Sequence, residues 1–196
     1  MLITVEGLDG AGKTTLVAGL SKALEERGER VMVLREPGGV EVSERIRELL
    51  KDPALEIDPR TEALLYAAAR AQLVAQELRP LLESGTTVVL DRFVDSSLAY
   101  QGAGRGLGVE AIRTLNAFGT GGLTPDRTLL LRIDPTAGIG RIADRPADRL
   151  EQEDVAFFAA IAEAYDALAA AEPERFAIID AGQPPESVLS DALAAL

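Results

Sequence analysis

The feature that most constrains the fold of this chain is a glycine-rich run close to the N-terminus. Residues 7–14 read GLDGAGKT and match the spacing G-x-x-x-x-G-K-[ST] of a phosphate-binding loop. Residues 2–6 before the run have the apolar character of a short strand, and residues 15–20 begin an amphipathic helix. Glycines let backbone N–H groups approach an anion, and the helix N-terminus adds unpaired donors. The run therefore predicts a strand, a tight turn and a helix that bind phosphates.

Two side chains of this run have a predicted chemical role. Lys13 is expected to reach the outer phosphates of a nucleoside triphosphate, and the Thr14 hydroxyl is expected to ligate Mg²⁺. The alternative is a loop that is rich in glycine only because it turns. The flanking strand and helix favour nucleotide binding, and the predicted ATP-binding residues are Gly7, Leu8, Asp9, Gly10, Ala11, Gly12, Lys13, Thr14 and Thr15.

Composition excludes several kinds of site. The chain has no cysteine and no histidine, which excludes disulfides, thiolate or histidine metal sites, and imidazole catalysis. The net charge of -12 argues against a protein that coats nucleic acid. No apolar run approaches bilayer-spanning length, and the N-terminus reads as a strand rather than a signal peptide. We expect a cytoplasmic protein without nucleic-acid or membrane partners.

Apolar runs alternate with helical patterns along the whole chain. The predicted strands are residues 2–6, 31–34, 86–90, 127–134 and 176–180. This alternation predicts one α/β domain over residues 1–196, with a five-stranded parallel sheet and helices on both faces. Residues 31–34 are continuously apolar, so we expect that strand to be buried on both faces. Residues 102–108 hold four glycines and predict a flexible turn.

Polar residues follow the predicted strands, at the sheet edge where such folds bind ligands. Asp91 directly follows an apolar strand. In proteins with a phosphate-binding loop, an aspartate at such a strand end lies near the bound Mg²⁺. Arg92 is placed to hold a second phosphate, although a surface ion pair is an alternative. Further arginines on separate segments suggest two anionic ligands brought end to end, as in phosphoryl transfer between nucleotides. The helical ones, Arg47 and Arg70, are equally consistent with solvated surface charges.

Five segments together closely resemble bacterial thymidylate kinases. They are residues 6–15 (EGLDGAGKTT), 35–39 (REPGG), 66–70 (YAAAR), 91–102 (DRFVDSSLAYQG) and 148–153 (DRLEQE). The resemblance implies the three-layer α/β fold of P-loop nucleoside-monophosphate kinases. It also implies transfer of the γ-phosphoryl group of ATP to dTMP, with Mg²⁺, in dTTP biosynthesis, and a homodimer.

The resemblance also implies roles for individual residues. Asp9 corresponds to a carboxylate near the dTMP sugar and the metal, and Tyr66 stands where an aromatic residue stacks on thymine. Tyr100 crowds the sugar C2′, which disfavours ribonucleotides. The implied dTMP-binding residues are Asp9, Arg35, Pro37, Arg47, Tyr66, Arg70, Arg92, Ser97, Tyr100 and Gln101, and the implied metal-binding residues are Thr14, Asp91 and Asp9.

Residues 139–150 are expected to form a mobile lid. Some members of the family carry an arginine inside the phosphate-binding loop, but residues 8–11 read LDGA here. The resemblance is to the bacterial type in which the lid supplies that cation. Arg145 and Arg149 are the better-placed candidates, whereas Arg141 is as readily a solvated charge. The implied catalytic residues are Lys13, Arg92, Asp9, Arg149 and Arg145.

Two alternative functions are open at this point. One is a kinase for a different nucleoside monophosphate, against which Tyr66 and Gln101 argue. The other is a nucleotide-dependent interaction protein, such as a switch or an inactive regulator. The chain has no N-K-x-D segment of the kind that reads guanine, and the intact Lys13, Thr14 and Asp91 argue against loss of catalysis.

Overall fold

A computed structural model describes residues 1–142 and 147–196. Its centre is a five-stranded parallel sheet in the order β2-β3-β1-β4-β5. The strands are β1 (Leu2–Gly7), β2 (Val31–Arg35), β3 (Thr87–Asp91), β4 (Arg127–Arg132) and β5 (Phe176–Asp180). All five predicted strands are confirmed within two residues at each end, and all their carboxyl ends lie at one edge of the sheet.

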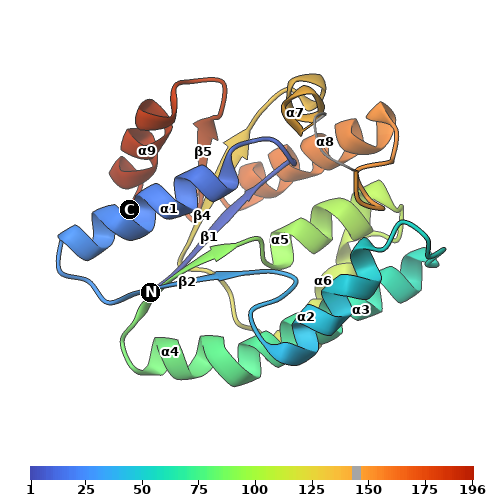
Figure 1. The fold of residues 1–196 in the computed structure, drawn as a ribbon, viewed down its shortest axis with the longest axis horizontal. Coiled ribbons are helices and arrows are strands. Elements are labelled where there is room, and N and C mark those ends of the chain that lie inside the picture. The colour runs from blue at the N-terminus through green and yellow to red at the C-terminus, as the bar shows by residue number, and fades with distance from the viewer. Residues whose placement is uncertain (143–146) are drawn as a thin grey trace.

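Helices cover both faces of this sheet, as predicted (Figure 1). The helices α1 (Lys13–Glu26) and α9 (Pro185–Ala194) lie on one face, over a core that includes Ile3, Val5 and Leu129. Side chains that alternate with these, such as Leu2 and Leu130, pack on the opposite face. The helices of that second layer and of the connections are α2 (Glu41–Lys51), α3 (Pro59–Leu73), α4 (Arg79–Glu83), α5 (Val94–Ser97), α6 (Val109–Thr120), α7 (Pro135–Ile142) and α8 (Val155–Ala171).

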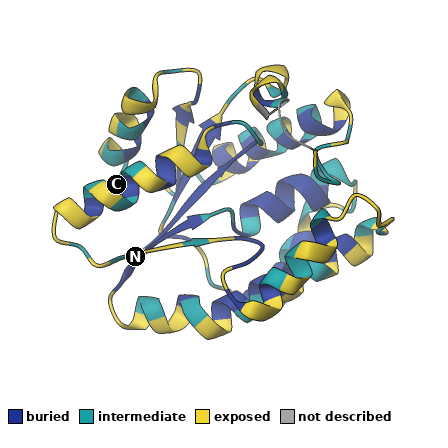
Figure 2. Ribbon diagram, in the orientation of Figure 1, coloured by how far each residue is buried: buried dark blue, intermediate teal, exposed yellow. Residues whose placement is uncertain are grey.

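The expectation that residues 31–34 are buried on both faces is wrong. Met32 is 40% exposed and Val33 is 43% exposed, because β2 is the edge strand and pairs only with β3. The central strands are almost wholly buried, whereas the outer surface of α1 is exposed (Figure 2). A continuous apolar run predicts a strand of a parallel sheet, but it does not determine how many neighbours that strand has.

Two π-helical segments, η1 (Val74–Leu78) and η2 (Leu98–Gly104), were not predicted. The first joins α3 to α4 just before Pro80, whose ring cannot follow a regular helical turn without a clash. The second replaces part of the flexible turn expected over residues 102–108, and for residues 102–104 that expectation is wrong. Because η2 contacts both α6 and α8, it gives a rigid position to the side chains it carries.

No helix in the described parts of the chain is long and apolar enough to cross a membrane.

Candidate active site

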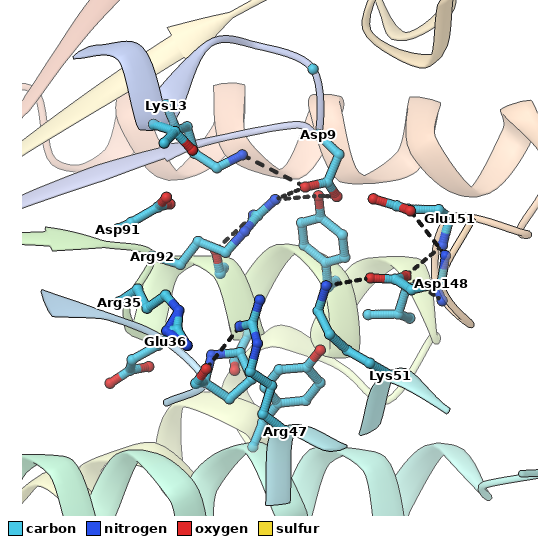
Figure 3. Close-up of a pocket in the computed structure, with 18 of the residues that line it drawn as sticks. Asp9, Lys13, Arg35, Glu36, Arg47, Lys51, Asp91, Arg92, Asp148 and Glu151 are labelled. Carbon is cyan, nitrogen blue, oxygen red and sulfur yellow. Dashed lines mark hydrogen bonds and ion pairs between the residues drawn. The ribbon is translucent and has the colours of Figure 1, made fainter. Parts of the chain in front are cut away.

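A cavity of about 450 Å³ opens at the carboxyl ends of β1, β2 and β3 (Figure 3). It brings together residues that are far apart in the sequence. The predicted residues that line it are Asp9, Gly10, Gly12, Lys13, Thr14, Arg35, Pro37, Arg47, Tyr66, Arg70, Asp91, Arg92, Ser97, Tyr100, Gln101 and Arg141. Every predicted dTMP-binding residue and every predicted metal-binding residue is among them.

The phosphate-binding loop holds Lys13 at one end of this cavity. The Lys13 ammonium donates to the carbonyl oxygens of Gly7 at 3.2 Å and Leu8 at 2.9 Å. Burial lowers the pKa of Lys13 to about 8, and the charge of Arg92 adds to this effect. Gly10 has a φ of 78°, and a Cβ there would lie 2.1 Å from the Gly138 carbonyl oxygen. Glycine is therefore required at this position, where α7 approaches the loop.

Arg92 is the only non-glycine residue with a positive φ in residues 1–142 and 147–196. This left-handed conformation is costly for a side chain that has a Cβ. Its guanidinium compensates through donations to Asp9 Oδ1 at 2.7 Å, the Gly7 carbonyl at 3.1 Å, Ser96 Oγ at 3.1 Å and the Tyr100 hydroxyl at 3.2 Å. Arg92 is thus fixed between the phosphate-binding loop and the rest of the cavity.

Asp9 carries a negative charge at neutral pH. Burial alone would raise its pKa, but the charges of Arg92 and Lys13 outweigh burial and hold the pKa of Asp9 well below its usual range. Asp9 also accepts a hydrogen bond from the Tyr100 hydroxyl at 3.2 Å. Figure 3 shows the side chains of Lys13 and Arg92 both directed toward this carboxylate.

The Arg70 side chain is only 2% exposed and most of its donors are used within the protein. Nε donates to Glu36 at 2.6 Å, NH1 to Ser97 Oγ at 2.9 Å and to Asn116, and NH2 to the Phe93 carbonyl at 2.9 Å. A guanidinium has five N–H donors. Four are committed within the described residues, which leaves a single N–H on Arg70, a residue that lines the cavity.

Glu36 is a buried carboxyl that sequence reasoning did not single out. Its Oε1 is buried and has no hydrogen-bond partner in the described residues, while Oε2 accepts from Arg70. Burial raises the pKa of Glu36 from 4.5 to about 7, although Arg70 acts in the opposite direction.

We expect Glu36→Gln to change how stability depends on pH. A carboxyl with a raised folded-state pKa contributes stability in full below its ordinary value of 4.5, and this contribution is lost as the pH rises through about 7. The advantage of the wild-type protein over Glu36→Gln should therefore shrink between pH 5 and pH 8. Thermal unfolding of both proteins across this range measures it, and parallel curves would contradict the assignment.

The remaining predicted arginines differ in what they contact. Arg35 forms an ion pair with Glu44 at 2.9 Å, and Arg47 donates to the Pro37 carbonyl at 2.8 Å. Both line the cavity. Arg141 donates to the carbonyls of Gly10 and Ala181, both at 3.2 Å, and so connects the phosphate-binding loop to the segment after β5.

Arg149 does not line the cavity. Its NH1 lies 2.7 Å from Glu62 Oε2, and its Nε donates to the Leu50 carbonyl at 3.0 Å. Arg145 lies outside the described residues. Of the three lid arginines, Arg141 alone is brought to the cavity within the described parts of the chain.

Asp91 and Thr14 fit a hard cation. Asp91 Oδ1 is buried and has no hydrogen-bond partner in the described residues. Thr14 lines the same cavity. Magnesium is usually held by one or two protein oxygens together with phosphate oxygens and water, so this donor set suits Mg²⁺ in the presence of a nucleotide.

A second cavity, of about 760 Å³, begins at Gly7 and Leu8 and extends past Ile133 to Gly182. Arg141 lines both cavities. Ala11 and Thr15, which were predicted to bind ATP, line neither. Ala11 is packed in the core against α1, and Thr15 is exposed at the start of that helix.

Glu6 and Glu62 were also missed. Glu6 is buried at the end of β1 and accepts from the Phe93 N–H at 2.7 Å and the Tyr165 hydroxyl at 2.8 Å. It thereby stabilises the turn that carries Arg92. A charged residue inside an apolar strand is a signal that could have identified it. Glu62 stands one helical turn before Tyr66 and two before Arg70, and this spacing was an available signal.

Comparisons of the whole chain with known proteins point to one family. A family model described as thymidylate kinase matches residues 5–192. A thymidylate kinase of Deinococcus radiodurans is 50% identical over 100% of this chain and 96% of the relative. One of Bacillus pumilus is 45% identical over 98% and 93%. The crystal structure of thymidylate kinase from Ehrlichia chaffeensis superposes with a TM-score of 0.81 at 30% identity, and the match covers 99% of this chain and 96% of that one.

Proposed function

Because the chain belongs to the thymidylate kinase family, we propose that its two cavities hold the two nucleotides of the reaction. The enzyme transfers the γ-phosphoryl group of ATP to dTMP, giving dTDP and ADP, in dTTP synthesis. Family membership removes both alternatives, a kinase for another acceptor and a regulator without catalysis. The fold is that of a P-loop nucleoside-monophosphate kinase.

The observation that carries the assignment of the site is the position of Arg92. Its guanidinium contacts both Asp9 of the phosphate-binding loop and Tyr100 of η2, and all three residues line the 450 Å³ cavity. A guanidinium there can bind the acceptor phosphate beside the donor phosphates, and such positioning is most of what phosphoryl-transfer catalysis requires.

Release of ADP, measured with and without dTMP and with a panel of other nucleoside monophosphates, tests this function. We expect ADP release that depends on dTMP. ATP turnover without any dTDP would overturn the assignment.

For the acceptor, we propose that Arg92 holds the dTMP phosphate, with Arg35, Arg47 and Pro37 at the same end of the cavity. Tyr66 would stack on thymine, and the free N–H of Arg70 would donate to a base carbonyl. Ser97 and Gln101 would complete the base contacts, while Asp9 and Tyr100 would lie against the sugar.

For the donor, we propose that residues 7–15 and Lys13 in particular bind the ATP phosphates. The second cavity would take the nucleoside, because it starts at Gly7 and shares Arg141 with the first. Thr14, Asp91 and Asp9 would hold Mg²⁺, which neutralises charge on the phosphates when bound. The unpartnered Oδ1 of Asp91 supports this part of the proposal.

We further propose that residues 139–150 act as a lid over the phosphates and supply a cation there. Arg149 is already bound to Glu62 and Leu50, and Arg141 to two backbone carbonyls. These contacts leave Arg145 as the lid residue best suited to reach the transferred phosphoryl group.

Discrimination between thymine and uracil should be modest. The two bases differ by one methyl group, and one methyl in an apolar pocket discriminates by about 10–200-fold. We expect kcat/KM for dUMP to be lower than that for dTMP by a factor in this range. Steady-state kinetics with both acceptors measure it, and equal values would show that the base pocket is assigned wrongly.

We propose that the chain forms a homodimer through the face that carries Leu64 of α3 and Phe118 of α6. Phe118 is 90% exposed and Leu64 is 57% exposed, on two helices that pack against each other. Large exposed apolar residues on adjacent helices are typical of an interface.

Phe118→Arg is expected to convert this dimer to a monomer, because it places a charge in the centre of the proposed apolar contact. Light scattering coupled to size-exclusion chromatography measures the mass. Val155→Arg, at another exposed apolar position, 53% exposed on α8, is the control and should leave the mass unchanged. An unchanged mass for Phe118→Arg would place the interface elsewhere.

A further inference from the structure

Glu62 on α3 is fully buried and lies beside the proposed base pocket, yet none of the roles above uses it. Its Oε1 accepts from Gln101 Nε2 at 2.8 Å. Its Oε2 lies 2.7 Å from NH1 of Arg149 and 3.1 Å from NH2 of Arg105. One carboxylate therefore joins the π-helical segment η2 to the end of the proposed lid.

These partners determine which way the Gln101 amide faces. A guanidinium can only donate, and Arg105 donates to both oxygens of Glu62, from Nε to Oε1 at 3.4 Å and from NH2 to Oε2 at 3.1 Å. Both carboxylate oxygens therefore act as acceptors. The Gln101 atom that faces Glu62 must then be the NH₂ group, and Oε1 must point away from it. Gln101 Oε1 accepts no hydrogen bond within residues 1–142 and 147–196, and it is not among the fully buried, unpartnered oxygens of these residues. Because Gln101 lines the cavity, this oxygen is available to a ligand.

We propose that Glu62 is a positioning residue that sets the pyrimidine specificity of the site by holding Gln101 Oε1 toward the base. This inference rests on the proposed function, in which Gln101 contacts the base. Thymine and uracil carry a hydrogen on N3, whereas N3 of cytosine is an acceptor. Gln101 Oε1, fixed in place, can accept a hydrogen bond from N3–H of thymine or uracil. It repels N3 of cytosine, which is also an acceptor.

The strength of this selection follows from the cost of turning the amide over. A flipped Gln101 would place Oε1 against the Glu62 carboxylate, which loses a charge-assisted hydrogen bond and creates a repulsion. Hydrogen bonds to charged groups correspond to about a tenfold to hundredfold change in an equilibrium. The flipped state is therefore scarce in the wild-type protein, and a base that needs it binds correspondingly worse.

Glu62→Gln tests the proposal, because an amide at position 62 can face either orientation of Gln101. The probes are dTMP and 5-methyl-dCMP, which share the methyl group and differ only at N3 and the neighbouring C4 substituent. Dissociation constants from isothermal titration calorimetry give the preference for dTMP. We expect this preference to fall at least about tenfold in Glu62→Gln, mainly through tighter binding of 5-methyl-dCMP. General damage to the pocket would not improve binding of the wrong base.

Arg105→Gln is the matched control. It removes another buried ion pair of Glu62 but leaves the contact between Glu62 and Gln101 in place. Its preference for dTMP should stay near the wild-type value. In a Gln101→Met background, Glu62→Gln should have no further effect on the preference, since there is no amide left to orient.

If Glu62→Gln is too unstable to purify, Glu62→Asp keeps the charge opposite Arg105 and Arg149 but is one methylene too short to hold Gln101. It should relax the preference in the same direction. An unchanged preference in both Glu62 variants, or an equal shift in Arg105→Gln, would overturn the proposal. Turnover of dTMP by the wild-type enzyme tests the proposed function separately.

Discussion

Arg92→Ala is expected to lower kcat/KM for dTMP by about 10²–10³-fold, the loss typical of removing one preorganised donor to a developing charge. Arg92 makes four contacts that fix its guanidinium, and it holds a left-handed backbone conformation that few arginines adopt. A side chain kept at that cost is preorganised to bind an anion, as its proposed role at the acceptor phosphate requires. Steady-state kinetics with dTMP as the varied substrate measure the loss.

Two variants separate the role of Arg92 in binding phosphate from its role in stability. Arg92→Lys keeps the charge but loses the fork that binds two oxygens at once, so it should recover only part of the activity. Arg45→Ala removes an exposed arginine of α2 that lines neither cavity, and it should leave kcat/KM unchanged. Truncation of Arg92 also leaves Asp9 without its main partner, so thermal unfolding must accompany the kinetics. Activity within tenfold of wild type in a folded Arg92→Ala protein would contradict the assignment.

The parallel sheet could be predicted because its causes are local. Apolar runs bounded by turn residues predict strands, and Asp58 followed by Pro59 predicts the start of α3, where the Asp58 carboxylate accepts from the N–H groups of Arg60 and Thr61. The order of the strands could not be predicted, since it depends on contacts between distant segments. The exposure of Met32 and Val33 follows from that order, and this is why their burial was predicted wrongly.

The glycines of residues 102–108 show the same limit. They were interpreted as sources of flexibility, but two of them are there because other elements come close. A Cβ on Gly102 would lie 3.1 Å from Val109, and one on Gly104 would lie 2.7 Å from Phe157 of α8. Close packing of η2 between α6 and α8 requires small residues, and a sequence does not distinguish this requirement from a flexible turn.

The site could be anticipated where residues follow strands or the phosphate-binding loop, because the carboxyl ends of parallel strands meet at one edge. Lys13, Asp91 and Arg92 are of this kind. The buried carboxylates could not be anticipated in the same way. Glu36 and Glu62 are ordinary charged residues in sequence, and their burial depends on arginines 34 to 87 positions away. Such carboxylates orient the residues that motifs reveal, and only the fold brings them together.

Arg145→Ala is expected to lower kcat by about 10³–10⁵-fold, the range for loss of a cation that stabilises a transferred phosphoryl group. The phosphate-binding loop has no arginine, so under the proposed function the lid supplies this charge. Arg141 is hydrogen-bonded to the carbonyls of Gly10 and Ala181. Arg149 is bound to the Glu62 carboxylate and to the Leu50 carbonyl. Affinity for ATP should change little, because the phosphate-binding loop provides most of it.

Single-turnover kinetics distinguish Arg145 from Arg149 as the source of this cation. Arg149→Ala should act mainly through the position of Glu62, so it should weaken dTMP binding and lower thermal stability more than it slows the chemical step. Arg145→Ala should do the reverse, since a cation that meets the phosphoryl group only in the transition state contributes to kcat and not to binding. A fast chemical step in Arg145→Ala together with a slow one in Arg149→Ala would exchange the two assignments. Arg149 would then have to leave the buried carboxylate of Glu62 in every catalytic cycle, at the cost of an unpaired charge in the interior.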